Sequence, residues 1–265
     1  MASEIEWRKL RADELRARAR EDAIVIVPVG SIEQHGPHLP VEVDSMLGET
    51  VAQETARRIA ATEPCLVLPM LWTGLSEHHM SFGGTITLDD VTFLAVLRCI
   101  CRSIVRHGFR RIVLLNGHGG NDNAMRVAAD MLTPELQVPI VQFTYWYAAA
   151  EPIAAILETQ KGLQHACEAE TSMMMTLRPE LVARDRIPMV KEANVTPQVG
   201  DIVGGGVYRW RTLGAMSSVG VIGNPHAASP EKGRRLIDGI AAEIARKLTN
   251  RELWALPYLS EKVDA

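Results

Sequence analysis

The sequence predicts an α/β fold with a largely parallel central sheet and helices on both faces of that sheet. Short apolar runs alternate along the chain with longer amphipathic stretches, which is the rhythm of strands joined by crossover helices. The chain has 265 residues and shows no internal repeat, low-complexity tract or linker that would divide it. We therefore predict a single domain, residues 1–265, large enough to bury a substantial core.

Four apolar runs are the predicted strands, at residues 23–29, 65–70, 111–115 and 139–144. Helical patterns lie at about 45–61, 89–107, 121–132 and 230–250, and a Met-rich helix opens at 165. The helix at 89–107 carries its own boundary signals, because Asp89 and Asp90 can cap its start and Gly108 can end it. A long Gly-rich stretch, about 191–229, precedes the last helix, and a loop of that length usually carries function or mediates assembly.

The composition narrows the class of protein. Hydrophobic residues make up 47% and charged residues 23%, as in ordinary globular proteins. The net charge of -4 argues against nucleic-acid binding, which usually shows a basic excess. No apolar segment approaches the roughly 20 residues of a membrane span, and the first residues carry charge where a signal peptide needs an apolar core. We expect a cytoplasmic protein that binds neither nucleic acid nor membranes.

Three potential metal ligands, Glu33, His35 and Asp44, follow the first predicted strand. Glu33 and His35 are two residues apart, so an extended backbone places both side chains on one face. Asp44 lies far enough along the chain for a Pro-containing loop to fold it back over them. Carboxylates and imidazoles are donors that zinc, manganese and iron accept. The segment predicts a metallohydrolase.

A second polar segment, Asn116–Asn121, follows the third strand. Because parallel sheets bind ligands beyond the carboxyl ends of their strands, the two segments should meet at one edge. Glycines keep the backbone close to whatever His118 touches, and we predict His118 as the fourth metal ligand. Asn121 is placed to cap the next helix. The alternative, a phosphate-binding turn, lacks its Lys-Ser/Thr ending.

A third segment opens the Met-rich helix. On a helix, His165 and Glu168 share a face, as do Ala166 and Glu170. One of the two carboxylates can complete a metal site while His165 serves as acid or base. The alternative is a helix start whose acids are favoured by the helix dipole.

Other polar residues are weaker candidates. The loop 74–85 contains Ser76 and the pair His78-His79. Adjacent residues rarely both face one ion, so we predict a loop that contacts substrate or water. Trp146, after the fourth strand, can wall the pocket. The four cysteines form no Cys-x-x-Cys pair and are expected to be reduced and mostly buried, with Cys167 as an alternative nucleophile. For His226 a structural role is favoured over a place in the site.

These motifs closely resemble the creatininase (creatinine amidohydrolase) family. The resemblance rests on Pro28–Pro40 with Asp44, on Asn116–Asn121 and on His165-Ala166-x-x-x-Glu170-Thr171-Ser172, in this order. It implies an α/β fold with a metal site at the carboxyl ends of the strands, commonly in a hexamer. By this resemblance Glu33 and His118 hold one metal and His35 the other, Asp44 bridges them, His165 shuttles a proton, and Ser76 contacts substrate.

One departure from the family pattern affects the expected metal site. Creatininases proper carry a metal-binding glutamate two residues after the histidine that corresponds to His118, and here that residue is Gly120. Either the second metal is lost or weak, or another carboxylate replaces the ligand, with Glu170 favoured over Glu168. The segment Gly162-Leu163-Gln164 also lacks the aromatics of creatininases proper. Creatinine itself is therefore not the expected substrate.

The sequence thus predicts a metal-dependent amidohydrolase that cleaves a C–N bond, with a cyclic amide favoured, through a metal-activated water. One or two divalent ions are expected, zinc first and manganese or iron as alternatives. The alternatives in function are a mononuclear formamide deformylase or precursor-peptide peptidase of the same family, and an inactive metal-stabilised binding or assembly protein. The expected partners are a small-molecule substrate and copies of the chain in a homo-oligomer. The predicted site residues are His165 and Glu168 for catalysis; Ser76, His79, Gly119, Gly120 and Trp146 for substrate; and Glu33, His35, Asp44, His118 and Glu170 for metal.

Overall fold

A four-stranded, entirely parallel sheet forms the centre of the molecule, in the strand order β2-β1-β3-β4. The computed structural model describes residues 4–190 and 208–256. The strands are β1 (Ile24–Val29), β2 (Cys65–Val67), β3 (Arg111–Asn116) and β4 (Ile140–Thr144). The predicted parallel sheet is confirmed. The second strand is shorter than predicted, because Pro69 has no N–H to donate and the regular ladder stops before it.

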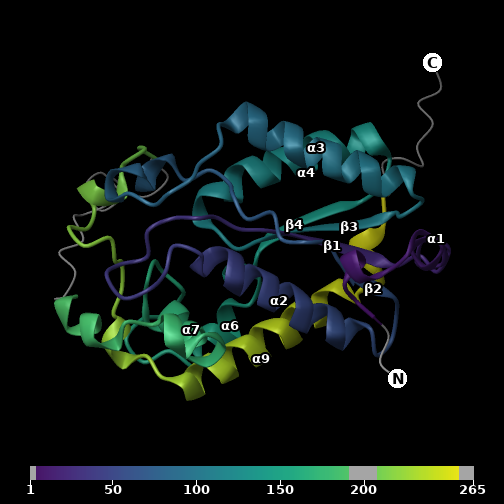
Figure 1. Cartoon of the computed structure of the whole chain (residues 1–265). Helices are drawn as coiled ribbons and strands as arrows, with labels where there is room; N and C mark the ends of the chain where they lie inside the picture. Colours follow the sequence, from purple (N-terminus) through teal and green to yellow (C-terminus); the bar gives the residue numbers. More distant parts are fainter. Residues whose placement is uncertain (1–3, 191–207, 257–265) are drawn as a thin grey trace.

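Helices cover both faces of the sheet, as predicted (Figure 1). One face is covered by α2 (Val43–Ile59), α7 (Glu168–Leu177) and α9 (Pro230–Leu248). The other face is covered by α3 (Asp90–Arg106) and α4 (Asp122–Leu136). The remaining α-helices in the described ranges are α1 (Ala12–Arg20), α5 (Tyr145–Ala148) and α6 (Ala150–Ala154).

The side chains of β1 point alternately to the two faces of the sheet, which explains why the core has two layers. Ile24 and Ile26 pack toward α2 and α9, whereas Val25 and Val27 point the other way, toward α3 and α4. Every residue of β1 is buried, so the strand reads as a continuous apolar run rather than as an alternating one. Truncating a core side chain of this kind to alanine costs about 2–5 kcal/mol of stability.

Local signals fix several helix ends. The carboxylate of Asp89 accepts a hydrogen bond from the amide of Thr92 at 2.7 Å, and Gly108 follows α3 with a φ of 94°. Both boundaries were predicted. Asn121 stands at the start of α4, but its side chain does not cap the helix. It bonds instead to the amide of Leu75 and the carbonyl of Gly30, tying three loops together.

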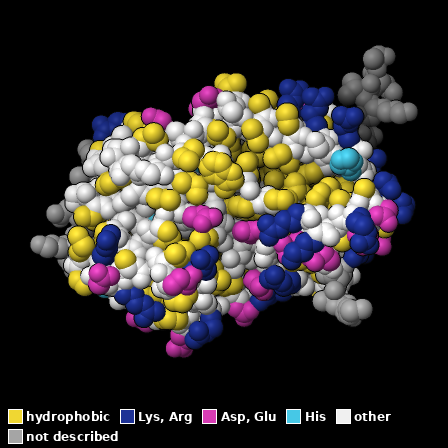
Figure 2. Space-filling model, viewed as in Figure 1, with side chains coloured by type: hydrophobic (Ala, Val, Ile, Leu, Met, Phe, Trp, Pro, Cys, Tyr) yellow, Lys and Arg dark blue, Asp and Glu magenta, His cyan; other side chains and the backbone are white. Residues whose placement is uncertain are grey.

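The register brings the strand ends to one level. Val29 pairs with Asn116, and Asn116 pairs with Thr144, so β1, β3 and β4 finish side by side. The segments that follow these three strands therefore leave the sheet at the same edge. None of the helices within the described ranges is long and apolar enough to cross a membrane. On the face seen in Figure 2, hydrophobic side chains gather across the middle of the molecule, and charged ones lie along its lower edge and right side.

Candidate metal centre

The polar segments meet at the carboxyl edge of the sheet, where the sequence predicts them. Glu33 and His35 come from the loop after β1, and Asp44 lies in the first turn of α2. A hydrogen bond from the Glu33 amide to the Val41 carbonyl, 2.9 Å long, folds that loop back on itself. His118 follows β3 in extended conformation, in a turn held by the Asn116 side chain.

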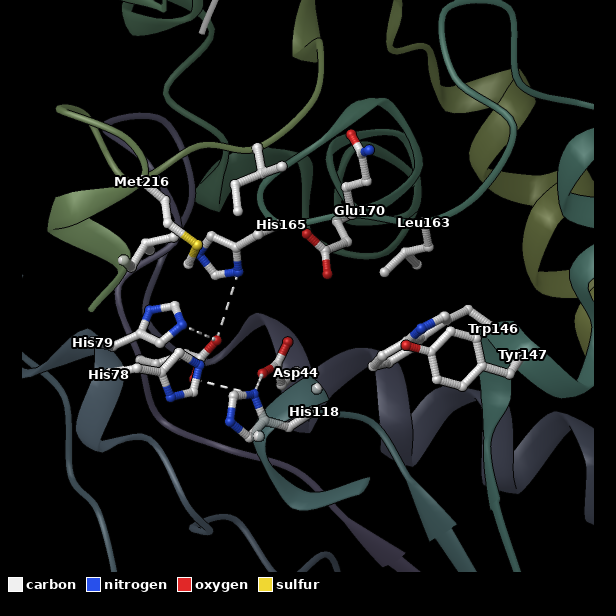
Figure 3. A pocket seen from close by; sticks show the side chains of 16 residues that line it. Asp44, His78, His79, His118, Trp146, Tyr147, Leu163, His165, Glu170 and Met216 are labelled. Carbon is white, nitrogen blue, oxygen red and sulfur yellow. Dashed lines mark hydrogen bonds and ion pairs between the residues drawn. The ribbon is translucent and has the colours of Figure 1, made fainter. Parts of the chain in front are cut away.

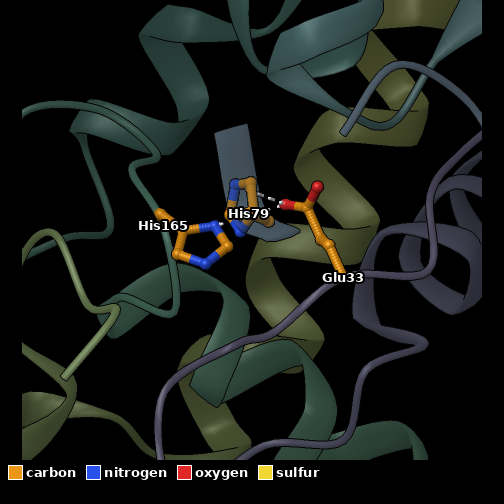
Figure 4. Close-up of side chains that lie close together, drawn as sticks. All are labelled: Glu33, His79 and His165. Carbon is orange, nitrogen blue, oxygen red and sulfur yellow. Dashed lines mark ion pairs between the residues drawn. The ribbon is translucent and has the colours of Figure 1, made fainter. Parts of the chain in front are cut away.

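Glu33 is surrounded by imidazoles. Its Oε2 lies 3.1 Å from His118 Nδ1, and its Oε1 lies 3.3 Å from His79 Nε2 and 3.6 Å from His165 Nδ1. Figure 4 shows the last two rings converging on the carboxylate. Burial raises the pKa of Glu33, but the charges of His118 and His79 and the hydrogen bond with His118 together bring the pKa to about 2. Glu33 is therefore an ionised carboxylate.

Asp44 lies between the two predicted histidine ligands. Its Oδ1 lies 3.1 Å from His35 Nε2, and its Oδ2 lies 2.8 Å from His118 Nδ1. The carboxylate thus presents one oxygen to each imidazole, which is the arrangement of a bridging ligand between two cations. Its place in the first turn of α2 also favours the negative charge.

Glu170 supplies the third buried carboxylate. Its Oε1 lies 3.9 Å from His35 Nε2, and its Oε2 accepts a 2.5 Å hydrogen bond from the amide of Ala166. Burial, and then the repulsion of Asp44, raise the pKa of Glu170 to about 8, although His35 opposes them. Glu170 is therefore largely protonated at neutral pH, and a divalent ion beside it would favour its ionised form.

The donor set fits divalent ions. Groups of three donor atoms lie within 4.8 Å of one another in four combinations: Glu33, His35 and Asp44; Glu33, His78 and His118; Glu33, His79 and His165; and His35, His165 and Glu170. His35 Nε2 is buried and has no hydrogen-bond partner among the described residues, although it lies 3.1 Å from Asp44 Oδ1. Burial lowers the pKa of His35, but the carboxylate of Asp44 contributes to raising it to about 10. The surroundings of His35 therefore favour a positive charge. Oxygen and imidazole donors suit zinc, manganese and iron.

His165 precedes its helix rather than lying on it. Because α7 begins at Glu168, the prediction that His165 and Glu168 share a helical face is wrong. Ala166 has a φ of 52°, which turns the chain just before the helix. His165 Nε2 lies 2.7 Å from the carbonyl of Gln34 and must donate to it, so Nδ1 carries the lone pair and faces Glu33. Burial and the charge of His35 lower the pKa of His165 to about 3, which leaves a neutral imidazole.

Glu168 points away from the other carboxylates. Its carboxylate accepts hydrogen bonds from Thr159 Oγ1 at 2.6 Å and from Lys232 Nζ at 2.7 Å, and it does not line the cavity. The predicted catalytic contact of Glu168 is therefore corrected to a structural one. The side chain fastens the loop that carries His165 to the start of α9.

The loop after β2 contributes more than predicted. The short 3-10 helix Glu77–Phe82 brings both His78 and His79 to the cavity. Ser76 is fully buried and contacts His118 Nε2 at 3.2 Å and Ser31 Oγ at 2.5 Å, so it supports a predicted ligand instead of facing the cavity. His78 is the residue that the sequence argument missed, because the direction of a side chain in a short 3-10 helix cannot be inferred from spacing.

The donors line a cavity of about 220 Å³. Figure 3 shows the histidines on one side and Trp146 with Tyr147 facing them across the space. Gly119 and Gly120 also line it, as do Leu163, Met216 and Ile222. Trp146, Gly119 and Gly120 therefore lie where the sequence predicts them. Part of the long loop, residues 191–207, falls outside the described residues, and its later part supplies Met216 and Ile222.

The alternative roles of Cys167 and His226 find no support. Cys167 is fully buried, burial raises the pKa of its thiol to about 12, and its sulfur accepts a hydrogen bond from the Gln164 amide. A protonated, enclosed thiol is a poor nucleophile. His226 Nε2 bonds to the carbonyl of Val190 at 2.7 Å, which is the structural role favoured for it.

Comparisons with known proteins identify the family of the chain. A family model described as creatininase, creatinine amidohydrolase, matches residues 8–248. The chain is 32% identical over 231 residues to the mycofactocin precursor peptide peptidase of Mycobacterium ulcerans (strain Agy99), covering 84% of each chain. It is 31% identical over 258 residues to the creatinine amidohydrolase of Pseudomonas putida, covering 91% of this chain and 93% of the relative.

Solved structures show the same fold. A crystal structure of creatinine amidohydrolase matches with a TM-score of 0.79 and 28% identity, over 92% of this chain and 96% of that one. A manganese creatininase matches with a TM-score of 0.78 and 26% identity, over 96% of this chain and 100% of that one. The chain belongs to the creatininase family.

Proposed function

We propose that this protein is a metal-dependent amidohydrolase that cleaves a carbon–nitrogen bond of a small molecule, with a cyclic amide other than creatinine as the favoured substrate. One observation carries the proposal: three buried carboxylates and several imidazoles converge on one cavity at the carboxyl edge of the sheet. A buried cluster of this charge is costly unless a cation occupies it.

Two ions suit the geometry. Glu33 and His118, with Oδ2 of Asp44, would hold the first, and His35 and Glu170, with Oδ1 of Asp44, would hold the second. Glu170 thereby replaces the donor that Gly120 lacks. Zinc is favoured, with manganese or iron as alternatives.

Different residues of the chain would carry out different steps of the hydrolysis. When bound, a divalent ion lowers the pKa of a coordinated water and polarises a carbonyl oxygen. His165 Nδ1 can take a proton from the attacking water and return it to the leaving nitrogen, because Nε2 is committed to the Gln34 carbonyl. Gly119 and Gly120 bring backbone amides to the cavity, where they can stabilise an oxyanion. Trp146 packs against the substrate ring.

A peptidase is the second candidate, and a neighbouring cavity favours it. This cavity of about 460 Å³ shares His78, Gly119, Gly120 and Met216 with the first and is walled by residues 208–211. A peptide would extend from the scissile bond into this space. The mycobacterial relatives named for a precursor-peptide substrate fit the same reading.

Metal analysis followed by a substrate panel tests the proposal. Wild-type protein purified without chelators should contain near two equivalents of metal, and Glu170→Ala should contain one. The panel then compares cyclic amides, formamides and short peptides, with creatinine as the reference. One equivalent in both proteins would favour a mononuclear deformylase or peptidase. Metal without turnover of any panel member would favour an inactive binding or assembly protein.

We also propose a cytoplasmic homo-oligomer, a hexamer by family resemblance. Large hydrophobic side chains are exposed in and near the loop after β2, among them Trp72, Met80 and Ile86. Where such side chains form one contiguous patch, the patch marks an interaction surface. Light scattering on the purified protein should give about six times the 29.2 kDa chain mass, and a monomer would remove this part of the proposal.

A further inference from the structure

His78 is an imidazole whose ring makes no hydrogen bond or ion pair with any residue in the part of the chain that the structure describes. It is half-buried at the wall of the cavity, on the side where the other histidines lie (Figure 3). Its ring stacks on that of His118, with centroids 5.6 Å apart and planes inclined by 18°. It also meets His79 edge-on at 4.3 Å. The ring is thus held in place by packing while its nitrogens stay available.

One of these nitrogens reaches the donor cluster. A donor atom of His78 lies within 4.8 Å of donor atoms of both Glu33 and His118, as the ligands of one ion do. The same separation relates the other triads of the centre. Two imidazoles and the Glu33 carboxylate would then supply three of the four donors of a tetrahedral zinc site.

The packing around Gly120 shows which side chain occupies the space beside His118. A Cβ atom on Gly120 would lie 2.2 Å from the carbonyl oxygen of Leu75, 2.5 Å from His118 Nε2 and 2.9 Å from His78 Cε1. The backbone at Gly120 therefore lies directly against the His78 ring, and no side chain fits between them. In this chain the space beside His118 belongs to an imidazole that arrives from the loop after β2.

We propose that His78 is a ligand of the ion held by Glu33 and His118, as a further donor beside the Glu170 carboxylate that is assigned to the other ion. The assignment rests on the proposed function, since it needs a metal at this centre. It makes residues 76–79 part of the metal site rather than only a substrate loop, with Ser76 bracing His118 and His78 binding beside it.

Metal affinity tests the assignment without any substrate. Zinc affinity of the full-length protein would be measured by competition with a chromophoric chelator for wild type, His78→Ala, His78→Gln and His107→Ala. His107 is exposed at the end of α3, so its variant controls for the loss of a histidine. Both His78 variants should bind one ion at least about 10-fold more weakly, the lower end of the effect of removing even a supporting group.

Cobalt substitution gives a second readout. The visible absorption of the Co²⁺ protein should change in both His78 variants and stay unchanged in His107→Ala, while circular dichroism confirms that every variant is folded. Unaltered zinc affinity and an unaltered cobalt spectrum in folded His78→Gln would overturn the assignment while leaving the proposed function intact. Wild-type protein that binds neither metal would instead overturn the proposed function itself.

Discussion

At the scale of single residues, the orientation of His165 is the most informative feature of the site. Its Nε2 is committed to a backbone carbonyl, so only Nδ1 can exchange a proton in the cavity. We expect His165→Ala to lose nearly all turnover while metal content, measured by elemental analysis, stays at the wild-type level. If the variant loses a metal equivalent, His165 is a ligand, as its closeness to His35 and Glu170 also allows.

The two glycines after His118 make a matched pair. A Cβ on Gly120 would lie 2.2 Å from a backbone oxygen, whereas a Cβ on Gly119 meets nothing within 4 Å. Gly120→Ala should therefore destabilise the fold by about 1–3 kcal/mol, the usual cost of overpacking. Gly119→Ala should be close to neutral. Urea denaturation of both variants measures the difference, and equal stabilities would show that the turn relaxes freely.

The sequence predicted most of the site at this scale. Glu33, His35, Asp44 and His118 were chosen from their spacing after two strands, and the structure brings them together. Their roles as ligands remain predictions. Glu168 was misassigned because its partner, Lys232, lies 64 residues away along the chain. No local sequence pattern predicts that contact.

At the scale of elements, the start of α9 anchors the loop that carries His165. Lys232 Nζ contacts Glu168 at 2.7 Å and Glu158 at 2.9 Å, and it also donates to the carbonyl of Ala227. Removing one partner of a buried ion pair costs about 3–5 kcal/mol because the other charge is left uncompensated. Lys232→Met should thus lower the free energy of unfolding and weaken turnover through His165.

The double variant Lys232→Met, Glu168→Gln is the control for this effect. It removes both charges together, so thermal unfolding should recover part of the lost stability. No recovery would mean that packing of the lysine stem, rather than the uncompensated Glu168 charge, explains the loss.

The two cysteines of helix α3 differ in solvent exposure. Cys99 is exposed, whereas Cys101 is fully buried and burial raises the pKa of its thiol to about 12. Cys65 and Cys167 are also buried. At pH 8 a thiol reagent should therefore modify Cys99 rapidly in the native protein and all four cysteines only after denaturation. Rapid labelling of Cys167 with parallel loss of activity would revive a cysteine mechanism.

Element positions were predictable where the local pattern was strong. The apolar runs predicted all four strands, and the Asp89 and Gly108 signals predicted both ends of α3. The start of α7 was misplaced because Glu170 bonds to the Ala166 amide across a turn, and this tertiary contact competes with helix propensity.

At the scale of the whole molecule, the metal centre should contribute to stability as well as to chemistry. Glu33, Asp44 and Glu170 are all buried, and burial together with the charge of Asp44 opposes ionisation of Glu170, which a bound cation would favour. Dialysis against a strong chelator should abolish turnover and lower the melting temperature. Zinc or manganese at 100 times its dissociation constant should restore about 2.7 kcal/mol per ion. Activity that survives complete metal removal would exclude the metallohydrolase.

The donors of the centre are far apart along the chain. The earliest is Glu33 and the latest is Glu170, and between them lie α2, β2, α3, β3, α4, β4, α5 and α6. No fragment that lacks the second half of this span contains the full set of donors. A nascent chain therefore cannot capture its ions in order of synthesis, because the coordination sphere exists only once these long-range pairings have closed. Metal uptake should be among the last steps of maturation. A bound ion then indicates that the whole sheet has assembled.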